Sequence, residues 1–323
     1  MSFKKAKDLK FFGVIFLVTL VLILILRTFF AQSYTVSSSQ METALLKGDR
    51  LLVDKTAYGI RLPMTILSVP FTFDSFWGMK SYSRLIELDY KRMGEGRVSK
   101  NDIVLFNNPL ETDKPVDKRS LLLSRCLAVA GDTIVMDGNN LRINRESHIS
   151  SPDVLRAYSY NIEREDSIIP VMESFSIPVR TADSPDSTRK SILLNNYEYF
   201  ILNEKLPSYF LLESNEKSGT SYYFVVPAKG MEVELSDFNR SLYKDIILQE
   251  NPGDPQLEDS SAIEKYTFRD DYYWFVSDNP GEAVDSRQIG FVSERCIIGK
   301  VSYIWLSTSG GSINRDRSFS SVK

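Results

Sequence analysis

The chain has 323 residues, a formal net charge of -3 and 43% hydrophobic residues. Its length suits a core domain with an insertion, and its slightly acidic balance argues against nucleic acid as a partner, because phosphate binding needs a basic face. A single histidine, His148, argues against a histidine-based triad or a multi-histidine metal site, so we expect no metal and no other cofactor. Cys126 and Cys296 are too few for a disulfide framework. We expect buried thiols, and the alternative is one disulfide in an exported domain.

A long apolar run near the N-terminus predicts a membrane anchor. Residues 11–26 are uncharged and almost wholly apolar, and the run continues to residue 31 with one charge, Arg27. That is roughly 20 residues, enough to cross a bilayer as a helix. Four lysines precede it, Lys4, Lys5, Lys7 and Lys10, so the positive-inside rule places the N-terminus in the cytoplasm and the remaining chain on the far side. The alternative is a cleaved signal peptide, for which Ala31-Gln32-Ser33 offers a weak cleavage site.

Short alternating runs after the anchor predict a mainly β fold with a twisted antiparallel sheet rather than βαβ units. The predicted strands lie at residues 50–53, 102–106, 133–136, 141–144, 222–226, 272–276, 290–292 and 296–301. Asp137-Gly138-Asn139-Asn140 is typical of a tight hairpin turn, because Gly and Asn tolerate positive φ. Residues 58–90 are rich in proline and aromatic residues, so this segment either rests on the membrane surface or forms a satellite core.

The pattern becomes more polar from about residue 147, which predicts an inserted α+β cap domain. Within it, Ser236 is placed to cap a helix at residues 237–249, where apolar residues recur four positions apart. The serine-rich end of the chain predicts a disordered tail. The expected division is a cytoplasmic tail 1–10, an anchor 11–31, a β core 32–146, the cap 147–267, the rest of the core 268–306 and the tail 307–323.

Four blocks of sequence follow the anchor in a characteristic order. The first joins Ser38-Ser39-Gln40-Met41 to Gly48-Asp49, and the second is Asn-Asp-Ile-Val-Leu-Phe-Asn-Asn-Pro at residues 101–109. The third begins with Ser124-Arg125 and ends with Gly131-Asp132, and the fourth runs from Asp278-Asn279 to Asp285-Ser286-Arg287. Together they resemble bacterial signal peptidase I, in the long form with an enlarged cap. The resemblance implies a β fold of signal-peptidase type and peptide-bond hydrolysis as the family's chemistry.

That family uses a serine nucleophile, a neutral lysine base with a lowered pKa and a donor for the oxyanion. Matched block by block, its nucleophile falls on Gln40, its base on Ser124 and a serine that supports the base on Ala283. A carboxamide is neither a useful nucleophile nor a base, and replacing the lysine by serine removes the proton acceptor. Ser38 retains the position of an oxyanion-type hydroxyl. The remaining matched residues are structural: Met41, Gly48, Asp49, Arg125, Gly131, Asp132, Asp278, Asn279, Asp285, Ser286 and Arg287.

The leading hypothesis is therefore a non-catalytic pseudopeptidase, or an accessory or binding protein of protein export, in the bacterial inner membrane. Its partners would be the bilayer and signal peptides or preproteins bound by strand addition, an active signal peptidase paralogue or the export machinery. One alternative is an active peptidase that uses Ser38 or Ser39 with another lysine, although Lys118 would lie on the order of 20 Å from Ser124 along a continuous strand. A structural envelope protein with a closed groove is the other. Asp278 and Asp285 form either an acid pair or, as we favour, turn contacts and an ion pair with Arg287.

Overall fold

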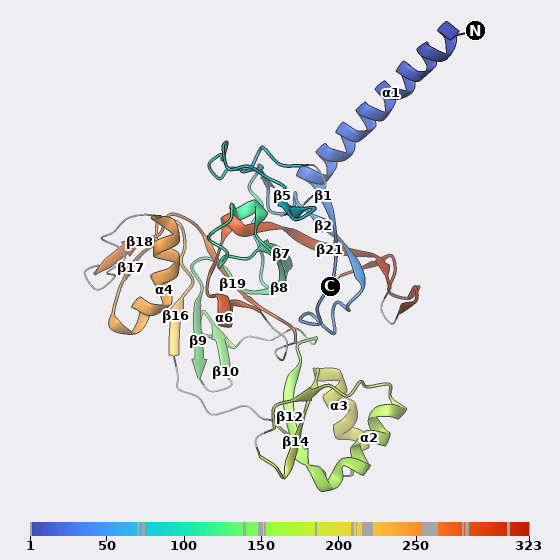
Figure 1. Cartoon of the computed structure of the whole chain (residues 1–323). Coiled ribbons are helices and arrows are strands. Elements are labelled where there is room, and N and C mark those ends of the chain that lie inside the picture. The colour runs from blue at the N-terminus through green and yellow to red at the C-terminus, as the bar shows by residue number, and fades with distance from the viewer. Residues whose placement is uncertain are drawn as a thin grey trace.

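One long helix leaves a body built mainly of β-strands (Figure 1). This computed structural model describes residues 2–69, 72, 75–137, 140–147, 151, 153–184, 186–207, 210, 212–214, 222–252, 264–279, 281, 284–308 and 311–322. The helix α1 (Ser2–Ile25) continues into a π-helical turn η1 (Leu26–Phe30). The segment Phe11–Phe30 has a mean hydropathy of 2.6, and the described protein covers none of it. An uncovered apolar helix of this length needs an apolar solvent, so it is a candidate membrane span.

The main sheet is antiparallel throughout, as the sequence predicts. Its strands in spatial order are β1 (Ala31–Thr35), β2 (Asp49–Asp54), β21 (Ile297–Ser307), β7 (Ile103–Asn107), β8 (Leu121–Ala128), β19 (Tyr272–Val276) and β20 (Val292–Ser293). On β2, Leu51 and Val53 are buried while Leu52 between them is exposed. This period of two points one face of the sheet into a core that Met41 and Leu45 cover.

The predicted hairpin and the predicted capped helix are both present beside this sheet. Strands β9 (Thr133–Asp137) and β10 (Asn140–Ile143) pair antiparallel, with two residues of their turn, 138 and 139, outside the described part. β10 also pairs with β11 (Glu146–Ser147), and β9 pairs with β16 (Tyr222–Val225). Helix α4 (Asp237–Glu250) begins after Ser236, whose side chain accepts a hydrogen bond from the Asn239 amide. The apolar side of α4 packs on this hairpin and on β19 in one shared cluster.

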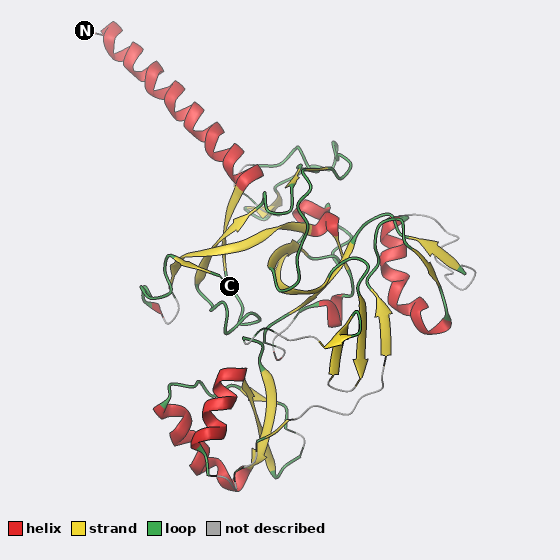
Figure 2. Cartoon of the chain, turned by 180° about the vertical axis from the view of Figure 1, so that it is seen from behind, coloured by secondary structure: helices red, strands yellow, loops and turns green. Residues whose placement is uncertain are grey.

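The region predicted as a cap contains a small α+β unit, separate from the main sheet and with its own hydrophobic cluster. It lies at the bottom of both Figure 1 and Figure 2. It is a sheet in the order β13 (Thr181–Ala182), β14 (Arg189–Leu194), β12 (Arg156–Asn161) and β15 (Glu213–Ser214), with η3 (Ile162–Arg164), α2 (Glu165–Ser174) and α3 (Asn196–Lys205). Neither α-helix was anticipated, because Pro170 interrupts the α2 pattern and the apolar residues of α3 are contiguous rather than spaced. The boundaries 147–267 stay a prediction.

The remaining elements are short, and several surround the base of α1. They are β3 (Ile60–Arg61) with β6 (Arg92–Met93), β4 (Ser75–Phe76) with β5 (Met79–Lys80), β17 (Glu232–Glu234) with β18 (Lys265–Thr267), η2 (Val116–Lys118), α6 (Ser286–Ile289) and η6 (Glu294–Cys296). Residues 58–90, for which the sequence left open a membrane-surface segment or a satellite core, contain both exposed and buried apolar side chains: Trp77 is 89% exposed and Met64 is buried. Both cysteines are buried and unbonded.

The end of the chain differs from the expected disordered tail. Strand β22 (Ser320–Ser321) pairs with β21, and the Arg317 guanidinium donates to Asp49 at 2.8 Å and to the Ala44 carbonyl at 2.9 Å. Val322 packs on the core cluster of the main sheet. A serine-rich composition therefore did not prevent ordering, because one arginine and one apolar residue find partners on the folded body.

Candidate active site

Three segments far apart in the sequence meet at the position matched to the nucleophile. The main-chain carbonyl of Gln40 accepts a hydrogen bond from the Asn279 amide at 2.9 Å. The Asn279 side chain also donates to the Ser39 carbonyl at 3.2 Å. The third segment is β8, whose Leu123 carbonyl accepts from the Gln40 side chain. Asn279 thus binds the turn that carries Gln40, and the Gln40 side chain joins this turn to β8.

The two Gly-Asp turns that frame the site share one local geometry. Gly48 has φ 94° and Gly131 has φ 87°, a left-handed conformation that a side chain disfavours. The carboxylates of Asp49 and Asp132 each accept a 2.9 Å hydrogen bond from the main-chain amide three residues earlier. Each motif therefore closes its turn by itself, which is why it is visible in the sequence.

The Gln40 side chain is almost fully buried, with 8% of the residue exposed. Its Nε2 donates to the Leu123 carbonyl oxygen at 2.5 Å. Next to it Met41, predicted as structural, is fully buried in the core, and Ser38 is half-buried two residues earlier. The carboxamide is therefore held inward against the sheet rather than directed into solvent.

The carbonyl that Gln40 binds lies on an edge of β8 that faces away from β7. The Asn108 amide donates to the Ser120 carbonyl and the Cys126 amide to the Asp102 carbonyl, both at 2.8 Å. In an antiparallel pair such hydrogen-bonded positions recur every second residue, so the even-numbered residues from 120 to 126 direct their main-chain polar groups toward β7. Leu123 has an odd number and therefore directs its main-chain polar groups away from β7. There β19 pairs with β8 only from residue 125 onward. Within the described chain, no strand pairs with this edge at residues 121–123.

Ser124, matched to the lysine base, is fully buried on β8. Its Oγ has no hydrogen-bond partner among the described residues, and the same holds for Ser277 Oγ. Extending the β8–β19 register by one residue places Ser277 opposite Ser124. A serine hydroxyl needs a base within hydrogen-bond reach to become a nucleophile, and neither hydroxyl contacts one in the described part. Ala283 and His148 lie outside the described residues.

A buried ion pair fixes the next residue along β8. The Arg125 guanidinium donates to both oxygens of Asp278, at 2.8 and 2.7 Å, and both side chains are buried. Burial raises the pKa of Asp278 above its ordinary value, although Arg125 pulls it down. The sequence signal was available, because Arg125 is a lone charge inside an apolar strand and such a charge needs a partner. Sequence reasoning did not identify Asp278 as that partner.

Asp285 forms the predicted contact with Arg287, so the two aspartates have separate arginine partners rather than each other. Arg287 donates to Asp285 at 2.9 and 2.6 Å, and the amide of Ser277 donates at 2.8 Å. Burial raises the pKa of Asp285, but these donors outweigh it and leave the pKa below its ordinary value. Ser286 Oγ accepts from the Phe275 amide at 2.9 Å, which joins this turn to β19.

The small α+β unit of the predicted cap contacts the turn that carries Gln40. Arg180 donates to Glu42 at 3.1 Å and to Glu198 at 3.0 Å. Thr43 Oγ1 donates to the Asp153 carbonyl at 2.7 Å. Residue patterns could not reveal these contacts, since Arg180 is one of many arginines in a polar region.

Lys118, the lysine considered as an alternative base, lies in η2 and lines a cavity that reaches Leu24 of α1. Neither Gln40 nor Ser124 lines that cavity. The hydrogen bonds described for Gln40 join it to Leu123 and Asn279. Those described for the Ser39 carbonyl come from Asn279 and from the Glu42 amide.

Comparison with known proteins agrees with the geometry. Residues 9–306 match the family model described as signal peptidase, peptidase S26. Signal peptidase I of Buchnera aphidicola subsp. Baizongia pistaciae is 23% identical over 89% of this chain and 73% of its own length. That of Helicobacter pylori 26695 is 23% identical over 90% of this chain and 80% of its own length, and that of Pseudomonas aeruginosa is 28% identical over 38% of this chain and 33% of its own. With a match across nearly the whole chain on a curled antiparallel sheet, the protein belongs to the signal peptidase family S26.

Proposed function

We propose that this protein is a membrane-anchored, non-catalytic member of the signal peptidase family that acts as an accessory or binding protein in protein export. The observation that carries the proposal is the 2.5 Å hydrogen bond from Gln40 Nε2 to the Leu123 carbonyl. A carboxamide has no hydroxyl with which to form an acyl-enzyme. Here its amino group also already donates to the Leu123 carbonyl.

The matched base position supports the same proposal. A lysine there would carry an amine that a buried apolar setting makes neutral and basic. Ser124 offers a hydroxyl in place of an amine, and no described residue forms a hydrogen bond with it. The sequence match also gives Ala283 where a supporting serine is expected.

The Gln40 contact bears on the kind of binding that remains. A peptide added as a strand would need the outward carbonyls of β8 at residues 121–123, and Gln40 already occupies the Leu123 carbonyl. The carboxamide must swing away before a signal-peptide segment pairs there. This favours an accessory contact with an active paralogue or with the export machinery over tight peptide capture.

The anchor gives the proposed location. Lysines before the apolar span Phe11–Phe30 favour a cytoplasmic N-terminus in the bacterial inner membrane, with the β domain on the exported side. The S26 relatives named above are bacterial signal peptidases I, so preproteins are the proposed clients of the complex in which this chain takes part.

A cleavage assay with the full chain in detergent tests the loss of activity. At equimolar protein and preprotein we expect no cleavage by the natural chain, little by Gln40→Ser/Ser124→Lys, and more when Ala283→Ser is added, because a base needs its supporting contact. Cleavage by the natural chain that disappears in Ser38→Ala or Ser39→Ala would overturn the proposal. An active signal peptidase I assayed beside it controls for the preprotein.

A further inference from the structure

A cavity of about 560 Å³ lies where the candidate anchor joins the β domain. Its wall includes Leu24 of α1, Thr28 of η1, Lys55 just after β2, and residues of η2 and of the 60–93 segment. In Figures 1 and 2 this segment lies beside the base of α1. The cavity therefore adjoins the end of the candidate membrane span.

The described lining of the cavity is basic. It contains four cationic side chains, Arg27, Lys55, Arg61 and Lys118, and one carboxylate, Asp117. That carboxylate is already engaged, because both its oxygens accept hydrogen bonds from the amides of residues 64 and 65 and from a threonine hydroxyl. Among the described lining residues positive charges therefore outnumber negative ones, which favours an anionic ligand.

Two of these groups show the effect of that excess. Burial, together with Arg61 and Arg27, lowers the pKa of Lys55 to about 8. Burial and a neighbouring arginine, Arg92, lower the pKa of Arg61 to about 10. An anion in the cavity would raise both pKa values again, because an opposite charge within a few ångströms favours the ionised form.

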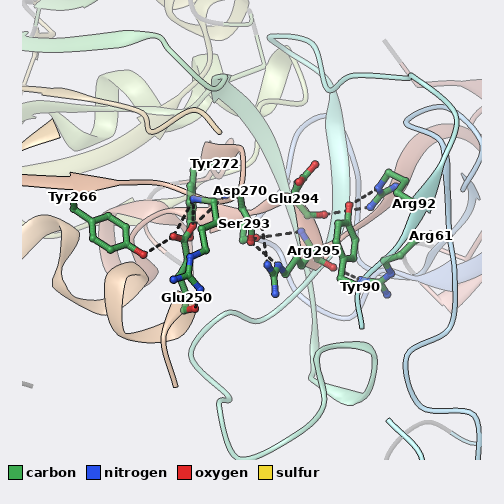
Figure 3. A network of polar contacts seen from close by, with 11 residues as sticks. Arg61, Tyr90, Arg92, Glu250, Tyr266, Asp270, Tyr272, Ser293, Glu294 and Arg295 are labelled. Carbon is green, nitrogen blue, oxygen red and sulfur yellow. Dashed lines mark hydrogen bonds and ion pairs between the residues drawn. The ribbon is translucent and has the colours of Figure 1, made fainter. Parts of the chain in front are cut away.

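Arg61 is also held in a suitable orientation. Its Nη1 donates to Asn107 Oδ1 at 2.9 Å and to the Arg295 carbonyl at 2.8 Å. Figure 3 shows Arg61 at one end of the polar network in which Arg295 pairs with Asp270. Among the described contacts none uses its Nε or Nη2, which form the fork that matches a phosphate. Lys55 donates to the Arg27 and Thr28 carbonyls at 2.9 and 3.3 Å, and an ammonium has three donors.

The rim of the cavity is apolar. Ile66, Val69 and Leu88 line it and are each about half exposed, at 52%, 46% and 48%. Basic side chains, an apolar rim and an adjoining membrane helix are expected of a binding site for an anionic lipid rather than of a site for a free ion. Resting on the membrane anchoring proposed above, we propose that this cavity binds the phosphate of an anionic phospholipid, with the acyl chains along the rim and α1.

Native mass spectrometry of the full chain in detergent tests this, with phosphatidylglycerol and phosphatidylcholine of equal acyl length added together. We expect phosphatidylglycerol to be retained preferentially. Lys55→Gln and Arg61→Gln should each weaken its retention roughly tenfold, since each removes a charge-assisted contact. Arg84→Gln is the matched control, because Arg84 is exposed, contacts Glu87 and the Asp113 carbonyl, and does not line the cavity.

Three other results would overturn the proposal. Equal retention of the two lipids removes the headgroup selectivity, and unchanged retention in Lys55→Gln places the lipid elsewhere even if Arg61→Gln fails to fold. Thermal stabilisation by inorganic phosphate equal to that by phosphatidylglycerol assigns the cavity to a free ion. Release of the chain from membranes by alkaline carbonate contradicts the anchoring instead, so the two proposals fail separately.

Discussion

Removing Arg125 should test whether the site is organised by the buried ion pair with Asp278. In Arg125→Met the apolar volume is largely kept, but Asp278, fully buried, loses two hydrogen bonds of 2.8 and 2.7 Å. A charge left buried without its partner costs about 3–5 kcal/mol of unfolding free energy. We expect that cost in urea denaturation of the full chain in detergent, followed by tryptophan fluorescence.

The same variant should respond to pH with a defined sign. The pKa of Asp278 is already raised by burial, and loss of Arg125 raises it further. A carboxyl whose folded pKa exceeds its unfolded value contributes stability below the unfolded pKa and loses it as pH rises through the folded pKa. The stability difference from the natural chain should therefore be larger at pH 8 than at pH 5.

The control is an ion pair with two exposed partners. Arg84 and Glu87 have side chains 56% and 39% exposed, so Arg84→Met should cost only about 0–1 kcal/mol. Arg125→Met/Asp278→Leu should recover much of the loss, because no buried charge is left unpaired. A cost below about 1 kcal/mol for Arg125→Met, or one that does not change with pH, would refute this account.

Three further changes probe the neighbouring residues. Ser124→Ala should leave stability unchanged or raise it by about 1 kcal/mol in the same denaturation assay, since a buried unpaired hydroxyl is removed; a clear loss would reveal a hidden partner. Gln40→Ala should increase capture of a signal-peptide mimic in a pull-down by freeing the Leu123 carbonyl, whereas capture no higher than by the natural chain would argue for a closed groove. Gly131→Ala should lower the free energy of unfolding by about 1 kcal/mol, because φ is 87°. No further cost is expected, since no atom lies within 4 Å of the new Cβ. A neutral result would mean that the turn relaxes. The pKa of folded Asp285 is held low, so its ionised form contributes stability above the unfolded pKa of about 4. That contribution should be lost as pH falls through the folded pKa, and unfolding followed during an acid titration would measure the loss.

Local patterns were sufficient wherever neighbours in the chain decide the structure. The apolar run predicts the helix α1, and Ser236 predicts the start of α4. Alternation at residues 50–53 and a run of large apolar residues at 272–276 predict strands. Gly48 and Gly131 mark turns that their own following aspartates close. The four matched blocks were likewise enough to suggest the family whose model matches residues 9–306.

Only the tertiary structure decided what each of these residues touches. Gln40 meets Leu123 across 83 positions and Arg125 meets Asp278 across 153 positions, so no window of sequence contains either pair. The helices of the cap, the packing of Val322 and the basic cavity at the base of α1 arise in the same way. Burial, charge balance and the polarity of a strand edge are properties of surfaces that come together on folding, and the order of residues alone does not contain them.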